Sequence, residues 1–238
     1  MNERFADALG RVVDPELAGP ELLPVRLAQA CAAILSVDGV SVSVIQGAQM
    51  RYPIGASNAE ATTAERLQFT VGEGPCLAAR ASQQVVRADE QMLATRWPQF
   101  HRRLLEATSY RSVMSLPLEG MLGDGGAMDL YLRDPDPSRI GMADAKAIAV
   151  EFAAGLGAQR WTDRMDGPVW LDTDAMLARG LVSVAIGMIT ITADVDFPDA
   201  LALLRGRAYS SGQSVDQVAA AVVSRSLPAS ALHPDQDP

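Results

Sequence analysis

The sequence has few of the residues that build disulfides, metal sites and catalytic triads. It contains only two cysteines, Cys31 and Cys76, and two histidines, His101 and His233. In a chain without secretory features, two cysteines are expected to remain free thiols. So few sulfur and imidazole ligands also provide no metal cluster and no catalytic triad. We therefore expect no metal, no cofactor and no enzymatic activity.

Long apolar runs and lysine are also lacking. No apolar run approaches the roughly 20 residues that span a bilayer, and the N-terminal residues carry acids without an apolar signal core. We expect a cytoplasmic protein that does not bind membranes. Of the 20 basic residues 19 are arginine, and the formal net charge is −9. Since this balance disfavours indiscriminate binding of polyanions, any nucleic-acid site must be local.

The first two thirds of the chain mix strand and helix patterns. Residues 40–45 and 50–56 resemble the two strands of a hairpin, and residues 111–118 and 127–132 flank a glycine-rich loop in the same way. A further short strand is expected at 85–87. Helical patterns cover 3–13, 20–36, 59–67, 97–107 and 143–164. This order predicts an α+β domain with a mainly antiparallel sheet flanked by helices.

The C-terminal region predicts three consecutive helices. A second helix is expected to begin at Pro198 and end at Gly212, and a third begins with a capping box formed by Ser214 and Gln217. The first helix repeats apolar residues every three or four positions, which predicts one stripe buried against a partner helix, within the bundle or across a dimer. The stripe consists of Leu177, Leu181, Val184, Met188 and Ile191.

These helices resemble the ANTAR domain, an all-α three-helix module that binds structured RNA in nascent transcripts and prevents transcription termination. The residues that carry the resemblance are Ala185-Ile186-Gly187-Met188, Asp199-Ala200, Leu203-Leu204-Arg205, Ala208, Val215 and Val218-Ala219. The resemblance implies RNA stem-loops as partners. Helical geometry and the resemblance together assign RNA contact to Arg179, Ile186, Arg205, Arg207, Ser211, Gly212 and Gln213.

Ile186 is the main departure from the family pattern, which usually has a lysine there. Helical geometry places Ile186 on the outward face with Arg179, opposite the apolar stripe. One interpretation keeps RNA binding through the remaining residues. The alternative is a protein-interaction regulator with the same fold, in which Ile186 extends a contact surface with Val182 and Ile189.

Residues 20–160 resemble a GAF domain of the type that precedes ANTAR modules, which implies a sensor for a small-molecule or redox signal. The resembling residues are Gly72-Glu-Gly-Pro-Cys76, Arg96-Trp97-Pro98 with Phe100, Arg111-Ser112-Val113, Leu116-Pro117-Leu118 and Leu130-Tyr131.

Two candidate sites follow within this region. Trp97, Phe100 and Tyr131 are candidates to line a ligand pocket with Arg96 and Asp129 as polar anchors, the alternative being ordinary core packing. Cys76 lies near a helix N-terminus, where the helix dipole lowers a thiol pKa and favours redox chemistry. The alternatives for Cys76 are a buried apolar role or, more remotely, a GAF enzyme that acts on methionine sulfoxide.

The predicted organisation has five parts. An N-terminal helical extension covers 1–19, the GAF-like sensor domain 20–165, a hinge 166–173, the ANTAR-like domain 174–227 and a disordered tail 228–238. The family resemblance implies a homodimer formed through the helices that flank the hinge.

Overall fold

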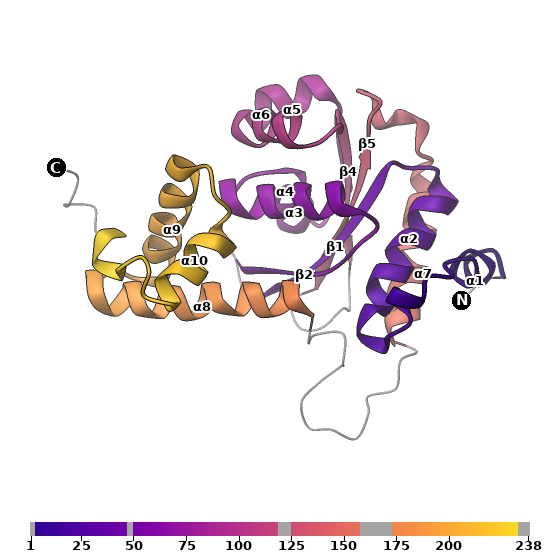
Figure 1. Ribbon diagram of the computed structural model, residues 1–238. Coiled ribbons are helices and arrows are strands. Elements are labelled where there is room, and N and C mark those ends of the chain that lie inside the picture. Colours follow the sequence, from indigo (N-terminus) through magenta and orange to yellow (C-terminus); the bar gives the residue numbers. More distant parts are fainter. Residues whose placement is uncertain (1–2, 47–49, 119–124, 158–172, 233–238) are drawn as a thin grey trace.

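The computed structural model describes residues 3–46, 50–118, 125–157 and 173–232. The described residues from 3 to 157 form what we call the sheet domain, and residues 173–232 form the C-terminal bundle (Figure 1). The predicted hinge residues 166–172 lie outside the described residues.

The sheet domain is built on five strands: β1 (Gly39–Gln46), β2 (Met50–Ala56), β3 (Val86–Ala88), β4 (Ser112–Leu118) and β5 (Gly126–Leu132). Their order is β2-β1-β5-β4-β3, and every neighbouring pair is antiparallel. The predicted antiparallel sheet is therefore confirmed. β5 is buried along its whole length, because it is the central strand and helices cover both faces of the sheet.

Helices α2 (Leu23–Leu35) and α7 (Met142–Gly157) lie on one face of the sheet, with α1 (Glu3–Gly10) beyond α2. Helices α3 (Ala59–Val71), α4 (Pro75–Ser82), α5 (Glu90–Arg96) and α6 (Pro98–Ala107) lie on the other. Each face has its own apolar core. Met128 and Leu130 of β5 pack toward α2 and α7, whereas Tyr131 packs with Phe100 and Leu104 of α6. The alternation along β5 thus separates the two layers.

The C-terminal bundle contains α8 (Asp174–Ala193), α9 (Phe197–Ser211) and α10 (Val215–Val223), as the sequence predicted. Asp196 caps α9, Gly212 ends it with φ of 68°, and both bonds of the capping box between Ser214 and Gln217 are formed. The predicted disordered tail is wrong for residues 229–232. They form a short 3-10 helix, because Leu232 packs into the apolar core of the bundle.

Within the single chain, the face of α8 that packs in the bundle is not the one that carries the apolar stripe, so burial of the stripe across a dimer stays a prediction. The stripe expected to be buried is open in the single chain: Leu177, Val184 and Ile191 are 61%, 51% and 85% exposed. Leu181 and Met188 on the same face are partly exposed. The opposite face is the buried one, with Val182, Ala185, Ile186 and Ile189 inside the bundle core. Because both faces of α8 are apolar, hydrophobic periodicity alone did not decide which one packs against α9 and α10.

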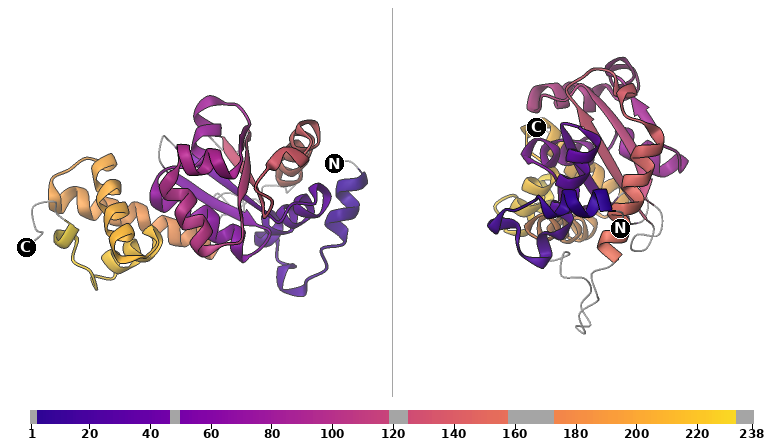
Figure 2. Two further views of the ribbon diagram at one scale, coloured as in Figure 1. Left: turned by 90° about the horizontal axis from the view of Figure 1, so that it is seen from above. Right: turned by 90° about the vertical axis from the view of Figure 1, so that its right-hand side faces the viewer.

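α8 joins the two parts, because it extends from the bundle along the edge strand β2 of the sheet domain (Figure 2). The hydroxyls of Tyr52 on β2 and Ser183 on α8 lie 3.2 Å apart. Edge strands expose unpaired backbone groups, and covering them with a helix is a common protection. The bundle is therefore attached to the sheet domain along an edge as well as through α3.

Contrary to expectation, one helix among the described residues is long and apolar enough to cross a membrane. This helix is α8, whose mean hydropathy reaches 1.7. Length and composition alone are weak evidence for a membrane span, because core helices of bundles pass the same test. The fully buried Arg179 of α8 is bound by carboxylates from two other helices, which fits a helix packed within protein.

Candidate functional site: a buried charge chain between the two parts

Arg179 lies at the centre of the contact between the sheet domain and the C-terminal bundle. Its side chain is completely buried. Its Nε and Nη2 donate to Oδ1 and Oδ2 of Asp216 on α10 at 2.8 and 3.3 Å, and Nη2 also donates to Oε2 of Glu65 on α3 at 3.4 Å. Nη1 donates to the backbone carbonyl of Arg51 on β2. The guanidinium is also stacked over Phe69, 3.5 Å from the ring centroid.

Glu65 continues these contacts into the sheet domain. Its Oε1 lies 3.8 Å from Nη2 of Arg51, and the same nitrogen lies 3.7 Å from Oδ2 of Asp129 on β5. Asp129, Arg51, Glu65, Arg179 and Asp216 thus form a series of alternating charges, which we call the charge chain. It runs from the central strand of the sheet to the bundle, so both parts contribute to one electrostatic unit.

The inner end of the charge chain is held by neutral polar side chains. Asp129 accepts hydrogen bonds from Ser115 at 2.5 Å, Gln68 at 2.7 Å and Tyr131 at 3.2 Å. Gln68 also accepts the backbone N–H of Cys76 at 3.0 Å, which ties the start of α4 to this cluster. Such networks stabilise a buried carboxylate when its hydrogen-bonding capacity is used.

Burial sets the protonation of the groups around Arg51. Burial lowers the pKa of Arg51, but the acidic groups beside it, Cys76, Glu65 and Asp129, raise it by more, so the guanidinium stays charged. Burial raises the pKa of Cys76 well above its ordinary value, and the nearby carboxylates of Asp129 and Glu65 add to the effect while Arg51 opposes it. The thiol is thus kept protonated. Nε and Nη1 of Arg51 have no hydrogen-bond partner among the described residues.

The predicted ligand-pocket residues are only partly brought together. Cys76, Asp129 and Tyr131 meet around the inner end of the charge chain. Trp97 and Phe100 instead pack in the apolar core beneath α5 and α6, to which the ring of Tyr131 also belongs. The expectation that Arg96 anchors a ligand with them is wrong, because Arg96 is exposed and stacks on Trp97, 5.1 Å from the ring centroid.

The predicted RNA-contacting residues fall into two groups. Arg179 and Ile186, expected on the outward face of α8, are buried, so that placement is wrong. The reason is that Arg179 meets carboxylates of α3 and α10, and the helix face that carries it is thereby turned inward. Arg205 is partly buried, and its Nε donates to the carbonyl of Phe69 at 3.1 Å near the C-terminal end of α3. The exposed residues are Arg207, Ser211, Gly212 and Gln213.

Sequence reasoning missed Arg51, Glu65, Gln68 and Asp216. Only the spacing of Glu65 and Gln68, three apart on one helix face, pointed to a common polar surface. Arg51 lies on an edge strand and Asp216 in the first turn of a helix, positions where charges are ordinarily solvated. Their meeting depends on the docking of the bundle.

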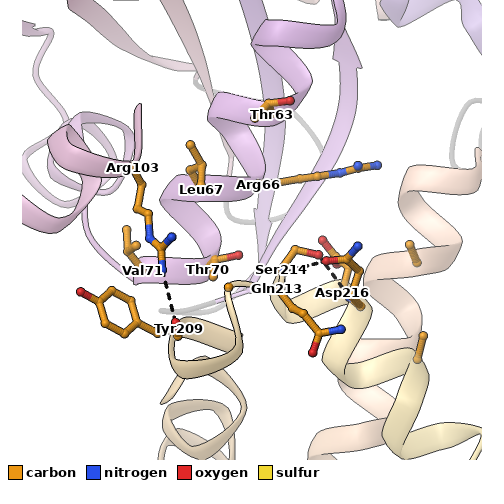
Figure 3. Close-up of a pocket in the computed structure, with 14 residues that line it drawn as sticks. Thr63, Arg66, Leu67, Thr70, Val71, Arg103, Tyr209, Gln213, Ser214 and Asp216 are labelled. Carbon is orange, nitrogen blue, oxygen red and sulfur yellow. Dashed lines mark hydrogen bonds between the residues drawn. The ribbon is translucent and has the colours of Figure 1, made fainter. Parts of the chain in front are cut away.

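A pocket of about 410 Å³, which we call the seam pocket, lies beside the charge chain (Figure 3). Arg66 and Thr70 extend from α3 on one side, and Gln213 and Ser214 lie on the other in the turn between α9 and α10. Tyr209 closes one end, where Nη2 of Arg103 donates to its carbonyl at 3.2 Å. The remaining lining residues are Thr63, Leu67, Val71, Ala178, Gly212, Asp216, Gln217 and Ala220.

Two solved structures illustrate what this chain is similar to. Both are GAF domains of phosphoenolpyruvate-protein phosphotransferases, from Acinetobacter and from Coxiella burnetii, each 14% identical to this chain. The first has a TM-score of 0.43 and covers 70% of this chain and all of its own, and the second has a TM-score of 0.45 and covers 65% and 94%. No protein-family model and no curated protein matches the chain. The α+β architecture therefore rests on the strands and helices described above.

Proposed function

We propose that this protein is a signal-responsive regulator in which a GAF-like sensor domain controls an ANTAR-like bundle that binds hairpin-loop RNA in nascent transcripts and prevents transcription termination. The order of the two parts and the capped three-helix bundle support this reading. In the same reading the protein is a cytoplasmic, non-enzymatic regulator.

The charge chain is the observation that carries the proposal. It couples the C-terminal bundle electrostatically to the interior of the sheet domain, because Asp129 in the central strand and Asp216 in the bundle belong to one series of buried charges. Arg205, a predicted RNA contact, is simultaneously docked on α3. Arg207 and the turn at 211–213 are thus accessible to RNA, whereas Arg205 is partly buried against α3. This is the arrangement expected if the sensor domain limits RNA binding by the bundle.

Assembly as a homodimer belongs to the same proposal. The open face of α8, which contains Leu177, Leu181, Val184, Met188 and Ile191, carries no charge. Leu177, Val184 and Ile191 are exposed, whereas Met188 packs partly against the bundle core. Gly180 and Gly187 lie beside it, and a Cβ on either would meet nothing within 4 Å, so a second helix can approach closely. A second copy of α8 is the natural occupant, since its repeat of three and four residues is self-complementary.

Sedimentation of a Val184→Asp variant tests the dimer. A charge in an apolar helix pair is expected to convert the dimer to a folded monomer, whereas Val13→Asp, at a residue 83% exposed on another part of the chain, leaves the mass unchanged. A Val184→Asp protein that sediments as the wild type does would rule out this face.

A second candidate function is a protein-interaction regulator with the same fold. Ile186 cannot form part of its contact surface, because this side chain is buried. The open apolar face of α8 is the candidate surface instead. The third candidate function, redox catalysis by Cys76, is disfavoured for two reasons. Burial keeps the thiol protonated, and the side chain is completely inaccessible to a substrate.

Crosslinking RNA to the protein in cells, followed by sequencing, tests the leading proposal. RNA hairpins recovered this way should bind the purified protein, and Arg207→Ala should weaken binding and lower the log–log salt slope by about 0.7 to 0.9. Arg133→Ala, which removes another exposed arginine far along the chain from the bundle, serves as the matched control. Absence of enriched RNA would favour the protein-interaction reading, whereas equal affinities of the wild type, Arg207→Ala and Arg133→Ala would remove Arg207 from the RNA site.

A further inference from the structure

The seam pocket has the size and lining of a ligand site, and its walls come from both parts of the protein. At about 410 Å³ it falls within the ~300–1,000 Å³ range of small-molecule pockets. Leu67, Val71, Ala178 and Ala220 provide apolar wall, while hydroxyl and amide groups from α3 and from the start of α10 provide polar contacts. Occupants of this pocket contact the sheet domain and the bundle at the same time.

The charges that line the seam pocket favour an anion. Arg66 extends into it from α3 and forms no hydrogen bond or ion pair among the described residues. Arg103, at the Tyr209 end, forms an ion pair of 3.5 Å with Glu106. Because the Glu106 side chain is 51% exposed, solvent largely screens this attraction. The one acid in the lining is Asp216, and both of its carboxylate oxygens already accept hydrogen bonds from Arg179. Two guanidiniums thus face the pocket without an equal number of free carboxylates, in a protein of net charge −9.

We propose that the seam pocket binds a small organic phosphate of about the size of a nucleoside diphosphate. Guanidinium groups recognise phosphate by paired charge-assisted hydrogen bonds, and the apolar wall suits a flat organic group. Bound there, the ligand bridges Arg66 and Arg103 of the sheet domain to Gln213 and Ser214 of the bundle. It therefore strengthens the docked arrangement, and this role does not depend on the bundle binding RNA.

Isothermal titration with ADP, pyrophosphate and adenosine tests the class of ligand. ADP is expected to bind most tightly, pyrophosphate more weakly because it lacks the organic group, and adenosine least because it lacks phosphate. Arg66→Gln and Arg103→Gln should each weaken ADP binding by about tenfold to a hundredfold, the loss of one or two charge-assisted hydrogen bonds. Arg133→Gln, an exposed arginine outside the pocket lining, is the matched control and should keep the wild-type affinity.

Hydrogen exchange locates the ligand. ADP should slow exchange of amides both at 63–71 in α3 and at 213–217 in the bundle, because the pocket is shared. Protection on one side only would overturn the bridging placement, and equal binding of ADP by wild type and both pocket variants would overturn the site. Phosphate groups of RNA are the other source of this chemistry. If Arg66→Gln weakens binding of an RNA hairpin while no mononucleotide or pyrophosphate binds, the arginine serves RNA and the proposal is wrong.

Discussion

Replacement of Arg179 by glutamine is the most direct perturbation of the contact between the two parts. Glutamine keeps a polar side chain but removes the positive charge and the fork that binds Asp216 at 2.8 and 3.3 Å. It also removes the contacts to Glu65 and to the carbonyl of Arg51, together with the stacking on Phe69. Glu65, only 1% exposed, then keeps Arg51 at 3.8 Å as its remaining cationic partner.

The magnitude follows from burial. Because the Arg179 side chain is 1% exposed, solvent does not screen its interactions. Removing one partner of such a buried ion pair lowers the free energy of unfolding by about 3 to 5 kcal/mol. This is a large part of the ~5–15 kcal/mol that typically separates native and unfolded states. Asp216→Asn should cost less, about 1 to 3 kcal/mol, since that side chain is 12% exposed and Arg179 retains Glu65.

Urea unfolding followed by circular dichroism measures both variants and their combination. The double variant should be less destabilised than the sum of the two single variants, because the second change removes a partner already lost. Arg133→Gln is the surface control, since its pair with Glu60 has side chains 61% and 35% exposed and is worth about 1 kcal/mol or less.

Hydrogen exchange at individual amides distinguishes separation of the bundle from the sheet domain from unfolding of the whole protein. In Arg179→Gln, amides of α8 and β2 should exchange faster than in the wild type, while those of α2 and α7, on the opposite face of the sheet, change little. A loss of less than about 1 kcal/mol in Arg179→Gln, with additive behaviour of the double variant, would refute the buried charge chain as a stabilising link.

Four further outcomes are expected. Ile186→Lys should destabilise the bundle by several kcal/mol by burying an unpaired ammonium, measured by urea unfolding with Ile191→Lys, at an 85% exposed residue, as control. Neither cysteine should react with a thiol reagent in the native protein, and both should react in denaturant, because burial raises both pKa values and covers both thiols. Burial raises the pKa of Tyr110 to about 12; its contribution to stability is therefore full below the unfolded value of 10.0 and lost as the pH rises toward 12, a decline that Tyr110→Phe should reduce in alkaline unfolding. Gly212→Ala should cost about 1 kcal/mol, because φ is 68° there although no atom blocks a Cβ, and a Tm shift near zero would contradict the strain argument.

Local patterns in the sequence determined much of the secondary structure. The strands at 50–56, 112–118 and 126–132, the cap at Gly212 and the Ser214–Gln217 capping box all depend on neighbouring residues, so their signals are present in the chain itself. The short helix α5 was not predicted, because only the cap Asp89 marks its start. Strand alternation and turn residues also made an antiparallel α+β domain predictable.

The rotation of α8 was decided by tertiary structure. Its two faces are similarly apolar, so periodicity cannot rank them, and the choice rests on Arg179. An arginine is ordinarily placed toward solvent, but here Glu65 and Asp216 lie on separate helices that meet only when the bundle docks on α3. The charge chain and the seam pocket could not be predicted for the same reason. Each brings together side chains that lie more than a hundred residues apart, and a local sequence pattern carries no information about such contacts.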